Sequence, residues 1–263
     1  MAENKMVEEL EITGYSKGSF KKAITKVIKE IPLTIFLNDN EIVTLLCAYG
    51  HLKELAIGFL NSEGLIDSMD DIESIHVDDD KGIVEIFTRS RSKLSEKLFM
   101  KRVIPSGCGK GSSFYNVMDS LKCKKIDSQL RVSTDQVQSL MKKLHSLSNL
   151  YKSTRGVHNS ALAIPERILM FREDIGRHNA VDKINGECLL QRIQLDDKIL
   201  ITTGRITSEI LIKTGKMGIP VLISRSAATH LAVSMAKEIG ITSLGYVRGG
   251  SFTVYTHPER IEY

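Results

Sequence analysis

The sequence has no tryptophan and only four cysteines in 263 residues. Cys47, Cys108, Cys123 and Cys188 are too sparse for a disulfide-stabilised scaffold in a chain of this length. No apolar run approaches the roughly 20 residues that cross a bilayer. The charged residues 1–15 lack the apolar core of a secretory signal. These absences predict a cytoplasmic protein with reduced thiols and no membrane segment.

Charge is unevenly distributed along the chain. Residues 1–90 hold 9 Lys and Arg against 17 Asp and Glu, whereas residues 91–263 hold 27 against 15. A basic carboxyl-terminal part suits an anionic ligand such as a nucleotide, although a solvated lysine-rich surface gives the same balance. Nucleic acid is not an expected partner, because no basic run is interleaved with aromatic residues.

The first part of the chain has strand and helix patterns in close succession. Residues 31–47 alternate apolar and polar side chains on both sides of residues 38–40, which predicts a hairpin. Residues 72–87 predict a second hairpin. Between them, residues 51–66 have apolar side chains at helical spacing. We expect a small α+β region here.

The second part of the chain alternates regularly between strands and helices. Ser133 and Gln136 have the spacing of a capping box at the start of a helix, and residues 156–173 predict a hairpin. Strands separated by helices of roughly ten to fifteen residues require crossover connections, and therefore a largely parallel sheet. The predicted helices span about 175–191, 207–216 and 227–239, and the predicted strands cover 198–203, 221–225 and 243–247.

These patterns predict an α/β protein. Residues 131–263 are expected to form a three-layer α/β/α domain with a mixed sheet, and residues 1–130 a smaller N-terminal α+β region that includes Cys108. In such sheets, ligands bind where strands end and loops lead into helix N-termini. Each loop there carries an arginine beside glycine or hydroxyl residues, which predicts an anion-binding cleft. The four loops span residues 172–183, 202–209, 224–230 and 246–252.

A glycine-rich stretch, GCGKGSS at residues 107–113, surrounds Cys108. The P-loop pattern fails here at two of its fixed positions, and C-x-x-C fails because Gly111 stands where the second cysteine belongs. A single soft ligand also excludes a zinc site. Arg102 and Lys110 flank the thiol, and nearby cations stabilise the nucleophilic thiolate. A sulfur carrier and a small buried residue in a tight turn both fit this stretch.

Four other stretches help to choose between these two alternatives. They are ELAIGFLNSEGLI, EDIGRHNAVDK, YTHPERI and the run TTGRITSEILIKTGKMGIPVLISRSAATHLAVSMAKEIG. Together they resemble the formate dehydrogenase accessory sulfurtransferase family, FdhD/NarQ, from about Pro32 to the end of the chain. The resemblance implies a sulfurtransferase that takes persulfide sulfur from a cysteine desulfurase. It passes that sulfur to the molybdenum of the bis(molybdopterin guanine dinucleotide) cofactor before the cofactor enters formate dehydrogenase.

The family carries its reactive cysteine in a C-G-x-C-G stretch, and its first cysteine matches Cys108. The second is replaced by Gly111, which leaves a one-thiol relay intact but puts in doubt any step that needs a neighbouring thiol. Cys123 could substitute, although a plain surface cysteine is the simpler interpretation. Cys47 and Cys188 lie within apolar patterns and are expected in the core.

The resemblance also implies a fold similar to that of cytidine deaminases. His178 matches the histidine of the deaminase H-x-E motif, but the glutamate and both cysteines that complete a zinc site are absent. No metal is therefore expected, and a zinc-dependent nucleoside deaminase is a weaker third possibility. The former catalytic pocket is better interpreted as a site for the purine-like end of a nucleotide.

The expected ligands are the molybdenum cofactor as bound client and GDP-like nucleotides as its surrogates, with Arg248 on a phosphate. The expected partners are the desulfurase, the formate dehydrogenase apoenzyme and a second copy of the chain in a homodimer. The alternative function is a non-catalytic chaperone that holds the cofactor while Cys108 is inert. The predicted cofactor-binding residues are His178, Asn179, Asp182, Lys183, Thr203, Gly204, Arg205, Ser208, Ser224, Arg225, Ser226, Tyr246, Val247, Arg248, Gly249, Gly250 and Ser251.

Overall fold

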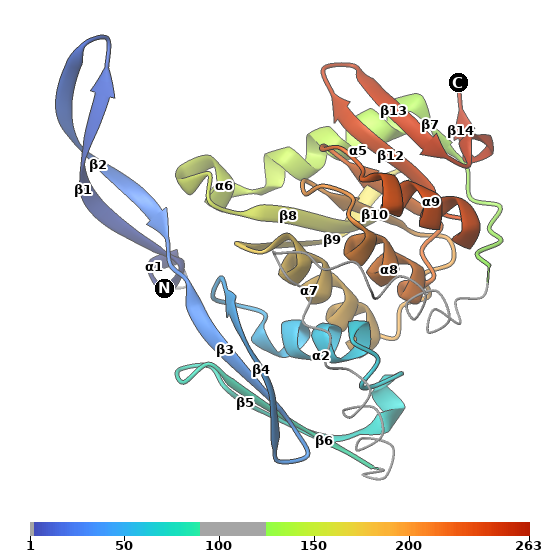
Figure 1. Cartoon of the computed structure of the whole chain (residues 1–263), viewed down its shortest axis with the longest axis horizontal. Helices are drawn as coiled ribbons and strands as arrows, with labels where there is room; N and C mark the ends of the chain where they lie inside the picture. The colour runs from blue at the N-terminus through green and yellow to red at the C-terminus, as the bar shows by residue number, and fades with distance from the viewer. Residues whose placement is uncertain (1–2, 90–124) are drawn as a thin grey trace.

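The computed structural model describes residues 3–89 and 125–263 (Figure 1). The described part contains a six-stranded sheet, a four-stranded sheet and two two-stranded sheets. A pair of helices, α2 and α7, lies between the two larger sheets (Figure 1). Within the described ranges, no helix is both long and apolar enough to cross a membrane.

The four-stranded sheet has the order β4-β3-β6-β5 and confirms both predicted hairpins. Asn38 and Asp39 adopt the left-handed backbone, with φ of 49° and 66°, which matches the right-handed twist of the flanking strands. Helix α2 begins one residue after His51 and packs its apolar face on this sheet. The elements are β3 (Ile31–Leu37), β4 (Asn40–Cys47), α2 (Leu52–Ser62), β5 (Ile72–Asp78) and β6 (Ile83–Thr88), with a short 3-10 turn at Met69–Asp71.

A two-stranded ribbon, preceded by α1 (Glu3–Met6), extends away from the rest of the molecule (Figure 1). Its strands are β1 (Val7–Ser16) and β2 (Ser19–Ile28). Both of its faces are exposed, including the rings of Tyr15 and Phe20. The sequence did not predict this ribbon, because strands with two solvated faces lack the apolar alternation that marks a half-buried strand.

The six-stranded sheet has the order β13-β12-β11-β10-β8-β9. Its three central strands, β10, β11 and β12, are parallel, and β8, β9 and β13 add antiparallel pairs at the two sides. This is the predicted mixed sheet. The strands are β8 (His158–Ile164), β9 (Arg167–Asp174), β10 (Ile199–Thr202), β11 (Val221–Ser224), β12 (Thr242–Arg248) and β13 (Ser251–Thr256).

Helices cover both faces of this sheet and give the predicted three layers. Alternate side chains of each strand point to opposite faces, so Leu162, Leu200 and Leu222 meet α7, α8 and α9. Their neighbours Ala161 and Ile201 meet α5 on the other face. The helices are α5 (Thr134–Leu147), α6 (Asn149–Thr154), α7 (Arg177–Leu190), α8 (Ser208–Met217) and α9 (His230–Ile239). The remaining elements are β7 (Val132–Ser133), which precedes α5, and at the C-terminus a 3-10 turn at Pro258–Arg260 and β14 (Ile261–Glu262).

Helices α2 and α7 touch through glycines. A Cβ on Gly58 would fall on the carbonyl of Asp182, and a Cβ on Gly186 would fall on the carbonyl of Glu54. The two backbones therefore meet without an intervening layer of side chains. The predicted division of the chain near residue 130 stays a prediction, but this contact places the two regions directly against each other.

The predicted capping box at the start of α5 is present. The backbone N–H of Gln136 donates to the Ser133 hydroxyl, and the backbone N–H of Ser133 donates to the side-chain oxygen of Gln136 at 2.8 Å. The predicted burial of Cys47 and Cys188 is also confirmed. Burial raises the pKa of each thiol to about 12, so neither is a nucleophile near neutral pH.

Candidate functional site

The four arginine-bearing loops meet at one edge of the six-stranded sheet, as predicted. Strand β8 is antiparallel to both β9 and β10, so β9 runs in the same direction as β10, β11 and β12. The carboxyl ends of these four strands, at Asp174, Thr202, Ser224 and Arg248, therefore lie on the same side. Helices α7, α8 and α9 begin at this edge.

A cavity of about 480 Å³ opens at this edge, within the size range of small-molecule sites. Four of the predicted residues line it: Thr203, Arg225, Ser226 and Arg248. The rest of the lining comes from the end of α5, from α6 and the turn after it, from the start of β8 and from the turn after β9. These residues are His145, Tyr151, Arg155, Gly156, Val157, His158, Asn159 and Ile175.

Hydrogen bonds among backbone groups and the hydroxyls of Thr203 and Ser224 fix the loops that line the cavity. The Thr203 backbone N–H donates to the backbone carbonyl of Asn159 at 2.9 Å, and the backbone N–H of Asn159 donates to the Thr203 hydroxyl at 3.0 Å. The Ser224 hydroxyl donates to the Gly204 carbonyl at 2.6 Å and accepts from the Ser226 amide at 2.9 Å. The first turn residues after β10 and β11 are thus held as one unit.

The electrostatics of the cavity favour an anion. Arg155, Arg225 and Arg248 supply three guanidinium groups from three elements. Arg225 donates to the His145 ring at 3.2 Å, and Arg248 lies 5.6 Å from the centre of the Tyr246 ring. Burial, together with the neighbouring Arg177 and His178, lowers the pKa of His158. Guanidinium forks of this kind suit phosphate groups, which they bind through paired hydrogen bonds.

The predicted residues of α7 lie elsewhere, on the opposite face of the sheet. Asp182 accepts from Lys213 at 2.6 Å and from the Ser62 hydroxyl at 2.7 Å, both in the interior. Lys183 is 1% exposed and pairs with Asp174 at 2.7 Å. These pairs join α7 to α2, α8 and β9. The structure does not bring Asp182 and Lys183 to the cavity, and their contacts with a cofactor stay predictions.

His178 and Asn179 are also engaged outside the cavity. The His178 Nε2 atom lies 2.9 Å from a carboxylate oxygen of Glu209, and this pairing lowers the pKa of Glu209. Asn179 donates to the carboxylate of Asp174 and to the carbonyl of Leu46. The other predicted residues that do not line the cavity are Gly204, Arg205, Ser208, Ser224, Tyr246, Val247, Gly249, Gly250 and Ser251.

No residue on the α5–α6 side of the cavity was predicted from the sequence. Its residues follow no loop motif, and the start of β8 looked like an ordinary hairpin strand. One signal was present: the polar pair His158-Asn159 directly precedes the small and apolar run SALAI. A fully buried asparagine there is unusual, because an amide in the interior needs hydrogen-bond partners.

One group of metal-ligand type occurs among the described residues, away from the cavity. His51, Glu54 and Glu187 place their ligand atoms within 4.8 Å of one another. Glu187 already pairs with Arg172 at 2.9 Å, so a cation would compete with a guanidinium. The hydrogen bond from His51 lowers the pKa of Glu54 to about 2. The group therefore forms an acid–base cluster between α2 and α7.

Cys108, the predicted sulfur carrier, lies outside the described residues, as do Gly111 and Cys123. The interpretation of Cys108 as a nucleophile therefore rests on the sequence around it and on the relatives of the chain.

The model of the FdhD/NarQ family matches residues 28–262. The chain belongs to this family. It is 43% identical over 258 residues to the sulfur carrier protein FdhD of Bacillus subtilis, a match that covers 98% of each chain. It is 46% identical over 247 residues to the sulfur carrier protein FdhD of Bacillus pumilus, covering 94% of each.

A solved structure supports the fold. The chain superposes with a TM-score of 0.81 on a Desulfotalea psychrophila protein described as a formate dehydrogenase accessory protein. The two are 27% identical, and the match covers 98% of this chain and 100% of the other. The predicted family and the predicted α/β fold are both confirmed.

Proposed function

We propose that this protein is a sulfur carrier that serves formate dehydrogenase, with Cys108 as the carrying thiol. The observation that carries the proposal is the near full-length match to relatives named sulfur carrier protein FdhD. In this proposal a cysteine desulfurase supplies the sulfur, and the molybdenum of bis(molybdopterin guanine dinucleotide) receives it. The protein acts in the cytoplasm as a homodimer and hands the cofactor to the apoenzyme.

Sulfur transfer to Cys108 is a thiol exchange. The Cys108 thiolate attacks the outer sulfur of the desulfurase persulfide, a new S–S bond forms on Cys108, and the desulfurase cysteine leaves as a thiolate. No oxidant is consumed, because the sulfane sulfur keeps its oxidation state. Nucleophilic attack requires a thiolate. Lys110 and Arg102 flank Cys108 in the sequence, and such cations favour that form.

The cavity fits the guanosine diphosphate ends of the cofactor client. Three guanidinium groups suit the two phosphates, and Tyr151 offers an aromatic face for a heterocycle. A buried amide in the lining, that of Asn159, has no hydrogen-bond partner among the described residues. In the proposal these residues bind and orient the client, and the molybdenum centre supplies the sulfur-accepting chemistry.

Replacing Cys108 tests the carrier. The variant Cys108→Ser should fold normally and fail to support active formate dehydrogenase, because serine cannot form a persulfide. Wild-type protein incubated with desulfurase and cysteine should gain the mass of one sulfur atom on Cys108, measured by mass spectrometry of peptides. Cys47 and Cys188 should stay unmodified, since burial raises the pKa of each to about 12.

Cys123→Ser is the matched control and should keep both loading and activity. Full formate dehydrogenase activity with Cys108→Ser would contradict the proposal.

A non-catalytic chaperone is the second candidate, and Gly111 favours it because the family's second loop cysteine is missing here. A chaperone would bind the cofactor through the same cavity without carrying sulfur. The loading experiment separates the two functions. Absence of a sulfur adduct on Cys108, together with retained binding of the cofactor, identifies the chaperone.

A further inference from the structure

Asn159 is the most unusual polar residue of the cavity. Its side chain is fully buried, with 0% exposed surface, and it lines the cavity at the start of β8. Neither the amide nitrogen nor the amide oxygen has a hydrogen-bond partner among the described residues. An unpaired buried polar group destabilises a fold by about 1–3 kcal/mol, so native proteins keep few of them.

The position of the amide is fixed by the backbone. Asn159 exchanges two hydrogen bonds with Thr203, one through its backbone N–H and one through its backbone carbonyl. It also pairs with Glu173 across the β8–β9 ladder. Strand alternation places its side chain on the same face as Ala161, toward the α5 side. The amide is therefore held in place before any ligand arrives.

The chemistry of the amide restricts what it can bind. The nitrogen donates hydrogen bonds and the oxygen accepts them. A phosphate or carboxylate ligand has only acceptors, so it would leave the amide oxygen unpaired. A partner that satisfies both atoms must present a donor beside an acceptor. The three arginines take the anionic part of the ligand, which leaves Asn159 for a neutral polar edge.

We propose that Asn159 recognises the lactam edge of a guanine-type ring, where N–H stands beside C=O. The amide nitrogen donates to the ring carbonyl and the amide oxygen accepts from the ring N–H. Asn159 is then the residue that selects the base, while the arginines bind phosphate without regard to the base. This inference rests on the proposed function, because it assigns the base of the nucleotide that the cavity is proposed to bind.

The test compares Asn159→Leu with wild type by calorimetry with GDP and by thermal unfolding without ligand. Leucine has a similar size but no hydrogen-bonding atoms, so the affinity for GDP should fall about 10- to 100-fold. The melting temperature should stay the same or rise, because the variant removes an unpaired buried amide. A purely structural asparagine would give the opposite pattern, with a lower melting temperature and unchanged affinity.

Asn185→Leu is the matched control. Asn185 is a buried asparagine outside the cavity lining, and its amide donates to Asn61 at 2.9 Å. Its replacement should lower the melting temperature and leave the affinity of the folded protein for GDP unchanged. The pair of variants thus separates loss of a base contact from loss of a structural amide.

The same contact can be tested by changing the ligand. Wild-type protein should bind 1-methyl-GDP, in which the ring N–H is blocked, about 10-fold more weakly than GDP. In Asn159→Leu the penalty of the methyl group should largely disappear, since the contact that it blocks is gone. ADP presents an amino donor beside a ring-nitrogen acceptor in place of the lactam edge, so it is the competing ligand, and the proposal requires it to bind wild type more weakly than GDP.

The outcomes separate this inference from the proposed function. If wild type binds no GDP at low or high salt, the nucleotide cavity is wrong and the inference fails with it. If wild type binds GDP and Asn159→Leu binds it equally well, the cavity stands and the role of Asn159 is overturned. ADP binding as tightly as GDP would overturn the lactam assignment alone.

Discussion

Three arginines line the cavity, and a different local interaction or backbone conformation positions each of them. Arg155 adopts the left-handed backbone that ends α6, with φ of 54°. Arg225 follows the last residue of β11 and is oriented by His145. Arg248 ends β12 and lies over the ring of Tyr246. Because three separate elements hold these residues, the cavity collects three positive charges from distant parts of the chain.

Arg248→Ala should weaken the binding of GDP about 10-fold, because a charge-assisted hydrogen bond to phosphate contributes about 1.5–3 kcal/mol. The loading of Cys108 with sulfur should not change. Calorimetry at low and high salt measures the affinity, and the difference between wild type and variant should shrink as salt screens the charge.

Arg205→Ala is the control for this variant. Arg205 lies in a loop at the same edge of the sheet but does not line the cavity, so its removal should change the affinity little. Equal affinity of wild type and Arg248→Ala for GDP would return the loop after β12 to a purely structural role.

At this scale, four of the residues predicted from the sequence line the cavity, all at or just after the carboxyl ends of strands, and the residues of its α5–α6 side were missed. Arg225 and Arg248 could be predicted because loops at the carboxyl ends of strands carry ligand contacts. Asn159 could not, because a single polar residue at the start of an apolar strand has no motif. Asp182 and Lys183 looked like a polar helix surface, but α2 and α8 cover them and turn them into buried ion pairs.

The contact between α2 and α7 explains that covering. Helix α7 has the six-stranded sheet on one side and α2 on the other, so nearly its whole circumference is buried. Its polar side chains are satisfied by partners from neighbouring elements: Lys213 for Asp182, Asp174 for Lys183 and Asn61 for Asn185. Periodicity assumes one solvated face, and therefore cannot describe a helix of this kind.

Gly58→Ala should destabilise the protein by about 3 kcal/mol, at the upper end of typical overpacking effects. The new methyl group would fall on the Asp182 carbonyl, and the two helices would have to separate. Chemical denaturation gives the change in the free energy of unfolding. Gly14→Ala in the exposed ribbon is the control, because a Cβ there meets only ordinary contact at 3.9 Å from the Lys21 carbonyl.

An unchanged denaturation midpoint for Gly58→Ala would show that the helices tolerate a side-chain layer between them.

The elements themselves were largely predictable, since turn residues and helical spacing defined both hairpins and the alternating helices. The β1–β2 ribbon was not, because its stability does not depend on a buried apolar face of its own.

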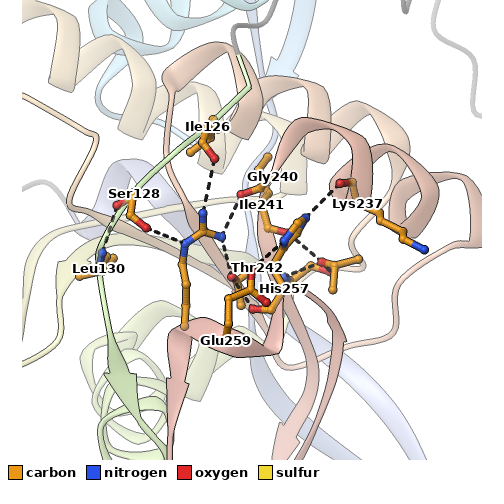
Figure 2. A network of polar contacts seen from close by, with 12 residues as sticks. Ile126, Ser128, Leu130, Lys237, Gly240, Ile241, Thr242, His257 and Glu259 are labelled. Atoms are coloured by element: carbon orange, nitrogen blue, oxygen red, sulfur yellow. Dashed lines mark hydrogen bonds and ion pairs between the residues drawn. The ribbon is translucent and has the colours of Figure 1, made fainter.

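Arg260 is the centre of a hydrogen-bond network that joins distant parts of the molecule; Figure 2 labels its partners Ser128, Gly240 and Thr242. The Arg260 side chain is 5% exposed and donates to the carbonyls of Ser128 and Gly240 at 3.1 and 2.9 Å, and to the Thr242 hydroxyl at 3.0 Å. His257 bridges the carbonyl of Lys237 and the carboxylate of Glu259 in the same region (Figure 2). The C-terminal turn, the end of α9 and the chain before β7 are thereby fixed together.

Arg260→Ala should lower the free energy of unfolding by about 3 kcal/mol, because it leaves several buried carbonyl groups without their donor. Thermal or chemical denaturation measures the loss. Arg131→Ala is the control: the Arg131 side chain is exposed and donates to the adjacent Leu130 carbonyl at 3.4 Å, so its replacement should change stability by less than about 0.5 kcal/mol. A neutral Arg260→Ala would mean that the network is not a source of stability.

More of the overall architecture than of the candidate site could be predicted from the sequence. The order of strands and helices after residue 131 defined a three-layer mixed α/β domain, because crossover connections allow few alternatives. The network around Arg260 and the α5–α6 wall of the cavity join residues far apart in the sequence. Contacts between residues far apart in the sequence leave no local sequence pattern, so these features could be found only in the structure.

The glycine contact between α2 and α7 also has a consequence for the order of folding during synthesis. Ser62 of α2 and Asp182 of α7 are hydrogen-bonded across 120 residues of chain. The four-stranded sheet and α2 leave the ribosome before α7, and the surface around Gly58 has no partner until α7 has been made. Lys213, which pairs with Asp182, comes later still. The N-terminal sheet therefore reaches its final packing only after most of the chain has been translated.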